Sequence, residues 1–301
     1  MMLSKDIRKK IILGSWSWSG QYKAVSNKEV EEIINLALKN NFFEFDTSPT
    51  YGKGEKILAE YKKKNKKILI DTKCGWNKNL KKTFEKDGLI EGINFAIEKF
   101  EKINAIQLHN PRSEIKKWDK IIYLLEEYKK KKFIKYSGIS LARNHYFPME
   151  VLNQFDFIQD EFNLLRVDPY YKMKKFKNCL VARSPFANGI LTSNFKQSST
   201  YSKKDHRFSW LRDARLKNIF KQKTILEDMT SDRIEKFAMD FIFSFKMFDK
   251  MIFGVRTKKQ FYDLLNNLNN IKVLKKDIIK KVLQINENNF FFNKSKNRYN
   301  N

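Results

Sequence analysis

The sequence predicts an α/β fold: a (β/α)8 TIM barrel in a single domain, with an extra C-terminal helix. Three observations favour this fold. The chain has 301 residues, a length that β/α barrels commonly reach as one domain. Its 42% of hydrophobic residues suffices for a large buried core. Short apolar runs alternate with helical patterns along most of the chain, which is typical of parallel strands joined by crossover helices.

Eight short apolar runs are the candidate strands. They lie at Lys10–Leu13, Phe42–Phe45, Lys67–Asp71, Ala105–Leu108, Ile134–Ile139, Phe155–Gln159, Asn178–Arg183 and Lys250–Phe253. Their apolar residues follow one another without alternation, as expected for parallel strands that are buried on both faces.

The segments between the candidate strands show helical spacing. Ser26 and Glu29 form a capping box, and an apolar stripe follows it over residues 30–37. Similar stripes cover residues 118–128, 234–245 and 261–268. The competing fold is an open doubly wound sheet. A G-x-G-x-x-G turn after the first strand would favour that sheet, and this turn is absent.

Two segments depart from the alternation of strands and helices. A long polar loop spans residues 192–209 after the seventh strand, and residues 272–286 predict the extra helix beyond the barrel. We therefore expect the barrel domain to span residues 1–287 and residues 288–301 to form a polar C-terminal tail.

The chain is strongly basic, since 61 Lys and Arg against 34 Asp and Glu leave a formal net charge of +27. These residues are spread along the whole chain, which favours a lysine-rich composition over the alternative of nucleic-acid binding. Two cysteines and three histidines disfavour a disulfide framework and a metal site. No run approaches the ~18 apolar residues of a membrane span, so we expect a cytoplasmic protein with no membrane contact.

A β/α barrel places its active site at the C-terminal ends of its strands, and four reactive side chains are expected there. Asp46 closes the second strand, Tyr51 lies in the loop that follows it, Lys73 follows the third strand directly, and His109 closes the fourth. An ammonium group beside a phenol lowers the pKa of that phenol, and a carboxylate keeps the lysine charged. A histidine can hydrogen-bond a substrate oxygen, so the four residues are candidates for general-acid catalysis.

Six segments resemble, in the same order, the motifs of the aldo-keto reductase family. Residues 45–52 read F-D-T-S-P-T-Y-G and are followed by E-K-I-L, which is similar to the family's F-D-T-A-x-x-Y-G and E-x-x-L. The other five segments lie at residues 71–75, 107–111, 133–140, 159–165 and 182–192. The resemblance implies a barrel enzyme that reduces a small-molecule aldehyde or ketone to an alcohol with NADPH, or with NADH as the alternative cofactor.

The resemblance also implies a role for each matching residue. Tyr51 would be the general acid, Lys73 with Asp46 would tune it, and His109 would orient the substrate. The cofactor-binding positions would be Ser140, Gln159, Arg183, Ser184, Phe186, Gly254, Arg256 and Gln260. Trp16 would line the substrate pocket.

Basic residues bear on the choice of cofactor and substrate. Arg256, Lys258 and Lys259 form a cationic cluster where the resemblance places the adenosine 2′-phosphate, which favours NADPH over NADH. The long loop after the seventh strand favours an anionic carbonyl substrate through its basic residues Lys203, Lys204, His206, Arg207 and Arg212. His145 and His206 lie in polar loop sequence, where surface roles are expected for both.

Two departures from the family pattern concern the cofactor. Leu141 and Leu264 stand where the family commonly has asparagines that contact the nicotinamide carboxamide and the adenine. Because the family also contains non-catalytic members, a cofactor-binding regulatory subunit of the same fold is the alternative function. No pattern in the sequence indicates an oligomeric state.

Overall fold

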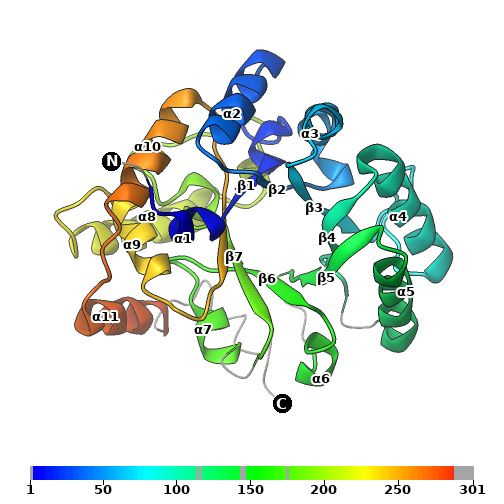
Figure 1. The fold of residues 1–301 in the computed structure, drawn as a ribbon. Helices are drawn as coiled ribbons and strands as arrows, with labels where there is room; N and C mark the ends of the chain where they lie inside the picture. The colour runs from blue at the N-terminus through cyan, green and yellow to red at the C-terminus, as the bar shows by residue number, and fades with distance from the viewer. Residues whose placement is uncertain (1–2, 113–114, 116, 143–146, 174–175, 288–301) are drawn as a thin grey trace.

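A computed structural model describes residues 3–287 of the protein, apart from 113–114, 116, 143–146 and 174–175. Eight parallel strands close into one barrel in the order of the sequence, with the last strand paired to the first (Figure 1). The strands are β1 Ile11–Gly14, β2 Glu44–Asp46, β3 Leu69–Cys74, β4 Ile103–His109, β5 Ile134–Ser140, β6 Phe157–Glu161, β7 Cys179–Arg183 and β8 Lys250–Phe253. The predicted (β/α)8 barrel is confirmed, and the open doubly wound sheet is excluded.

Each predicted strand overlaps an observed one, but the carboxyl ends of some strands run further than their apolar residues. β3 continues to Cys74, so Lys73 lies inside the strand and not directly after it as expected. The reason is that Lys73 pairs in register with Gln107 of β4 while its side chain is buried in the barrel. The strand therefore continues through residues whose polarity is typical of a loop.

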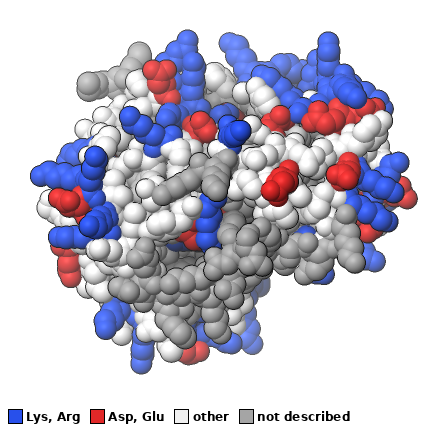
Figure 2. All heavy atoms as spheres, turned by 90° about the horizontal axis from the view of Figure 1, so that it is seen from below, with Lys and Arg blue, Asp and Glu red and all other residues white. Residues whose placement is uncertain are grey.

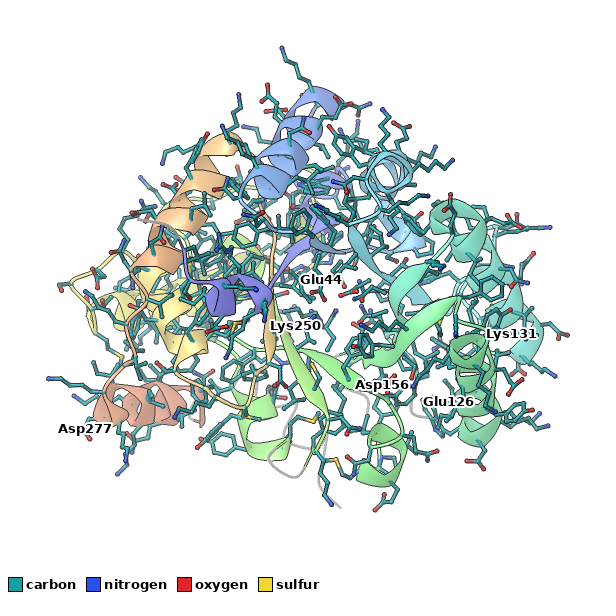
Figure 3. All side chains as sticks on the ribbon, viewed as in Figure 1. Glu44, Glu126, Lys131, Asp156, Lys250 and Asp277 are labelled. Atoms are coloured by element: carbon teal, nitrogen blue, oxygen red, sulfur yellow. The ribbon has the colours of Figure 1, made fainter. Side chains whose placement is uncertain are left out.

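Strand register places alternate side chains inside the barrel. One interior layer is apolar and consists of Ile12, Ala105, Phe157, Val181 and Ile252. Toward the amino ends of the strands, Lys250 and Glu44 form an ion pair, and Figure 3 shows their side chains close together near the middle of the barrel. Toward the carboxyl ends the interior becomes polar again, and this end holds the candidate site described below.

Helices surround the barrel (Figure 1). They are α1 Lys5–Lys9, α2 Asn27–Lys39, α3 Lys53–Lys64, α4 Lys86–Phe100, α5 Trp118–Lys130, α6 Met149–Leu152, α7 Asp168–Lys172, α8 Asp213–Glu227, α9 Ile234–Phe243, α10 Lys258–Asn269 and α11 Lys276–Glu287. The predicted capping box is present, because the Ser26 hydroxyl accepts from the backbone N–H of Glu29 while the Glu29 carboxylate accepts from that of Ser26. The stripe of α2 that follows is buried, as its spacing predicts.

The crossover helices after β5 and β6 are short, with 4 residues in α6 and 5 in α7. The extra C-terminal helix α11 is confirmed, although it begins later than expected. It is fixed to the loop after β6, because the Asn286 side-chain amide donates to the Leu164 carbonyl oxygen over 2.7 Å. Val282 on the same helix is fully buried. The tail expected at residues 288–301 lies outside the described residues.

The surface carries its charges in a scattered pattern. In Figure 2 the Lys and Arg side chains lie around the margins of the visible face, with Asp and Glu side chains among them. No helix in the described part of the chain is long and apolar enough to cross a membrane. Both cysteines, Cys74 and Cys179, are free thiols.

Candidate active site

A cleft of about 1020 Å³ opens at the carboxyl ends of the strands. It is lined by Tyr51 and His109, which come from the β2–α3 loop and the end of β4, and by Arg256 and Gln260, which follow β8. Most of the residues predicted for catalysis, cofactor binding and the substrate pocket line it: Trp16, Asp46, Tyr51, His109, Ser140, Gln159, Arg183, Ser184, Phe186, Gly254, Arg256 and Gln260. Lys73 is buried directly beneath the floor of this cleft.

Asp46 and Lys73 form a buried ion pair below the cleft. The Lys73 ammonium donates to Asp46 Oδ1 over 2.6 Å and to the Thr47 carbonyl oxygen over 2.8 Å. Burial opposes the charge of Lys73, but the carboxylate of Asp46 and the phenol of Tyr51 outweigh it and raise the pKa of Lys73. The lysine is therefore a fixed positive charge at this point.

Tyr51 ends the short helix Pro49–Tyr51, which begins after Ser48. The Lys73 ammonium lies 5.0 Å from the centre of the Tyr51 ring. Burial raises the pKa of Tyr51, and the positive charge of Lys73 lowers it by less. The expected net lowering of this pKa is thus wrong in the structure, because desolvation of the phenolate outweighs the effect of Lys73. Tyr51 keeps its proton at neutral pH.

His109, at the end of β4, lies with its ring centre 6.1 Å from that of Tyr51 in an edge-to-face arrangement. Burial, followed by the charges of Lys73 and Arg183, holds the pKa of His109 well below its usual 6.5. The imidazole is therefore neutral. Its Nδ1 atom lies 3.0 Å from the indole nitrogen of Trp76 and 3.2 Å from the hydroxyl oxygen of Ser48.

Amides from two strands complete the polar end of the barrel. The side-chain amides of Gln107 and Gln159 each donate to Asp46 Oδ2 over 3.0 Å. The Ser140 hydroxyl in turn donates to Gln159 Oε1 over 3.0 Å. Ser140 and Gln159 therefore stand side by side at the cleft floor, joined to the Asp46–Lys73 pair through one carboxylate.

The loop after β7 continues the cleft away from Tyr51 and His109. Arg183, the last residue of β7, donates to the Leu141 carbonyl oxygen over 2.9 Å. Ser184 and Asn188 have φ angles of 57° and 59°, in the left-handed region that non-glycine residues seldom adopt. Such backbone strain is held where the surrounding structure imposes it, and it clusters at binding sites. Phe186 packs against Phe253 at the end of β8.

Beyond β8 the cleft reaches the start of α10. Thr257 caps this helix by accepting from the backbone N–H of Gln260, and Gln260 Oε1 accepts from the backbone N–H of Arg256 over 2.7 Å. Burial, followed by the charge of Arg207, lowers the pKa of Arg256. Asn267 also lines this end, one turn beyond Leu264.

The cationic cluster expected from Arg256, Lys258 and Lys259 forms only in part. Lys258 is paired with Glu32 at 3.3 Å and does not line the cleft. Lys259 lines the cleft but is paired with an aspartate of the next helical turn, Asp263, at 2.9 Å. Arg256 lines the cleft and forms no ion pair in the described part of the chain.

Aromatic rings gather around Trp16 in the cleft. The Trp16 ring stacks with the Tyr51 ring at 6.4 Å and meets the His206 ring edge-on at 4.9 Å. The expectation of a surface role for His206 is thus wrong, because the loop after β7 folds back over the barrel and brings His206 to the cleft. The backbone N–H of His206 donates to the Gln21 carbonyl oxygen. His145 lies outside the described residues.

The basic loop contributes less positive charge to the cleft than its composition indicates. Lys203, Lys204 and Arg212 are exposed and do not line the cleft. Arg207 does line it, but its Nη2 and Nε atoms both donate to the Asp205 carboxylate, over 2.7 and 2.9 Å. The charge that Arg207 brings from this loop to the cleft is therefore largely offset.

Sequence reasoning missed several residues of the site. Gln107 lies two positions before His109 on β4, and the inward alternation of a strand would have placed both in the barrel. Trp76 and His206 carry no such signal, because loops bring them to the site.

A closed β/α barrel with a large cleft at the carboxyl ends of its strands defines a class of barrel enzymes. Within this class, the model of the Aldo/keto reductase family matches residues 10–287. The chain therefore belongs to the aldo/keto reductase family, whose members are NAD(P)H-dependent oxidoreductases that act on small-molecule carbonyl substrates.

Solved structures share the fold at low sequence identity. The glycerol dehydrogenase AKR11B4 from Gluconobacter oxydans superposes with a TM-score of 0.76 at 18% identity, over 93% of this chain and 92% of that one. The holo form of the aldo-keto reductase AKR11C1 from Bacillus halodurans gives 0.72 at 16% identity, over 92% of this chain and 91% of that one. A sequence search of curated proteins finds no match.

The residues of the cleft fit a nicotinamide dinucleotide. The polar groups of Ser140 and Gln159 line the cleft. The unpaired guanidinium group of Arg256, which also lines it, belongs to the segment just before the amino terminus of α10, an arrangement that suits phosphate. In the described part of the chain, no group of His, Cys, Asp or Glu side chains is arranged to hold a metal ion.

Proposed function

We propose that this protein reduces an aldehyde or ketone to an alcohol with NADPH, and that Tyr51 is the general acid. The observation that carries this proposal is the convergence of Tyr51, His109 and the buried Asp46–Lys73 pair at one end of a dinucleotide-sized cleft. The cofactor supplies the hydride when bound.

Side chains of the protein carry out the proton transfer. Tyr51 donates its hydroxyl proton to the carbonyl oxygen of the substrate, and the Lys73 ammonium stabilises the phenolate that this donation leaves. Asp46 keeps Lys73 charged and fixed in place. His109, neutral because of burial, donates a hydrogen bond to the same substrate oxygen and holds it for reduction.

The cofactor-binding role rests on side chains along the floor and walls of the cleft. Ser140 and Gln159 would bind the nicotinamide carboxamide, and Arg183 would stack on its ring. Residues further along would hold the pyrophosphate and the adenosine: Ser184, Phe186, Gly254, Arg256 and Gln260. Arg256 supports NADPH over NADH, because its unpaired guanidinium group suits a phosphomonoester. Without Lys258, which pairs with Glu32, this preference rests on Arg256 alone.

The substrate end of the cleft is more aromatic than basic. Trp16 would line the substrate pocket together with His206. The anionic substrate expected from the basic loop receives little support from the contacts, since Arg207 is paired with Asp205. The free thiols of Cys74 and Cys179 fit the reducing cytoplasm that we propose as the compartment.

Oxidation of NADPH and of NADH over a panel of aldehydes and ketones tests the proposal. Tyr51→Phe should lower kcat by about 10²–10⁴, the usual worth of a general acid, while cofactor binding stays intact. Tyr262→Phe is the matched control, because Tyr262 is 54% exposed and lies outside the cleft. Full activity of Tyr51→Phe would disprove the assignment. Tight cofactor binding without turnover of any carbonyl would favour the regulatory-subunit alternative.

A further inference from the structure

The geometry points to Trp76 as a positioning residue that selects the tautomer of His109. The two residues meet through one hydrogen bond, between the indole Nε1–H and the imidazole Nδ1 atom over 3.0 Å. The tautomer follows from the chemistry of these two rings. Its catalytic consequence rests on the function proposed above.

An indole N–H can only donate a hydrogen bond. The Nδ1 atom that faces it must therefore offer a lone pair. Because burial keeps His109 neutral, its single ring proton then lies on Nε2. The opposite tautomer would direct two N–H groups at each other and leave the Trp76 donor without a partner.

The second neighbour of Nδ1 does not make this choice. The Ser48 hydroxyl lies 3.2 Å from Nδ1 and can either donate to it or accept from it. It also exchanges a hydrogen bond of 3.0 Å with the Thr50 hydroxyl, which is equally able to donate or accept. Ser48 is thus compatible with both tautomers, and Trp76 with only one.

The selected proton points to where a substrate would bind. His109 lines the cleft beside Tyr51, whereas neither Trp76 nor Ser48 lines it, so the Nδ1 edge of the ring faces away from the cleft. The Nε2–H group is left on the cleft side, where it can donate to the same carbonyl oxygen as Tyr51. The other tautomer would present a lone pair to that oxygen and repel it.

The fold holds the Trp76 ring in place by a small hairpin. Trp76 and Lys82 form an antiparallel bridge, and the Lys82 ammonium lies 5.6 Å from the Trp76 ring while it donates to the Asn110 carbonyl oxygen over 2.9 Å. Gly92 of α4 gives the hairpin room, because a Cβ atom there would lie 2.2 Å from the Trp76 carbonyl oxygen. Through Lys82, the hairpin is therefore bonded to Asn110, the residue that follows His109.

Nitrogen-15 NMR of the histidine rings tests the inference directly, because the chain contains only three histidines. His145→Gln and His206→Gln variants assign the His109 signals. Wild-type His109 should show a protonated Nε2 and an unprotonated Nδ1 from about pH 6 to 8. Trp76→Phe keeps an aromatic ring but removes the donor, so a substantial Nδ1–H population should appear. Ser48→Ala, the matched control, should retain the Nε2–H pattern.

The two proposals fail in distinguishable ways. The NMR signals require no turnover, so an inactive protein still reports the tautomer. A wild-type Nδ1–H tautomer, or an unchanged Nε2–H tautomer in a folded Trp76→Phe variant, would overturn the inference. If carbonyl reduction is found, Trp76→Phe should also lower kcat/KM about tenfold, the worth of one substrate hydrogen bond, with cofactor affinity unchanged. The same loss with an unchanged tautomer would assign Trp76 a purely structural role and contradict the inference.

Discussion

At the scale of single residues, burial sets the protonation states on which the proposed chemistry depends. Burial lowers the pKa of His109 well below 6.5, so its neutral form persists as the pH falls through that value. Burial raises the pKa of Tyr51 above its usual 10.0, so the phenol keeps its proton as the pH rises toward that value. Both residues therefore hold the state that donates a hydrogen bond across the neutral range.

This arrangement predicts a flat pH profile. The kcat/KM for carbonyl reduction should vary by no more than about twofold from pH 6 to 9, because neither donor titrates in that interval. Steady-state rates in a buffer series of constant ionic strength measure the profile. The substrate should be one that is chemically stable from pH 6 to 9, so that its own decomposition does not change the rates. A fall in kcat/KM below about pH 6.5 would contradict the prediction, because it would show that burial does not lower the pKa of His109.

The candidate site could be predicted from the sequence only where strand ends determine it. Asp46 and His109 close their strands, so the barrel rule alone places them together. Trp76 could not be predicted, because it reaches His109 across 33 residues through a hairpin that no periodicity marks. His206 could not be predicted either, because its neighbours in the sequence are polar and indicate a surface loop. Only the structure shows that this loop folds onto Trp16.

At the scale of elements, apolar runs located all eight strands but not all of their ends. β3 and β6 run on through Lys73 and Glu161, whose side chains are buried at the polar end of the barrel. From the sequence alone, polar residues at the end of a strand are predicted to belong to a loop, since only closure of the barrel gives their side chains partners inside it. The helical stripe of α2 could be predicted because its spacing is local.

We propose that α11 belongs to the barrel domain spanning residues 1–287. Val282 is fully buried, so Val282→Ala should lower the free energy of unfolding by about 2 kcal/mol through lost contacts and the cavity it leaves. Urea denaturation followed by circular dichroism measures this loss. Lys281→Ala, an exposed neighbour on the same helix, should change stability by less than about 0.5 kcal/mol. A wild-type midpoint for Val282→Ala would mean that α11 contributes nothing to the domain.

At the scale of the whole molecule, charged side chains are scattered outside the barrel and paired inside it. The formal net charge of +27 is spread over the surface, where salt screens it. Inside the barrel, charges are concentrated at both ends of the strands and are paired there. At the end away from the cleft, the paired side chains come from four strands. Lys250 of β8 binds Glu44 of β2, and Asn104 of β4 donates to Asp71 of β3 over 2.6 Å.

Asp71 makes the stability of this closed end depend on pH. Burial, followed by the negative charge of Glu44, raises the pKa of Asp71 well above its usual 3.8. The folded chain therefore holds a proton that the unfolded chain releases above about pH 4. The stabilisation from this protonated carboxyl is complete below that pH and is lost as the pH rises toward the folded-state pKa.

Asp71→Asn should remove this pH dependence, because an amide has the shape of the protonated carboxyl and cannot ionise. Its Tm should exceed that of the wild type by about 2–4 °C at pH 8, and the difference should shrink to nothing near pH 4. Thermal melts across this range measure it. Asp277→Asn on α11 is the control, since Asp277 is exposed (Figure 3) and its substitution should change Tm by less than about 1 °C. A Tm deficit for Asp71→Asn at pH 8 would show that Asp71 is ionised in the folded barrel, and that Lys250 neutralises both carboxylates at this end.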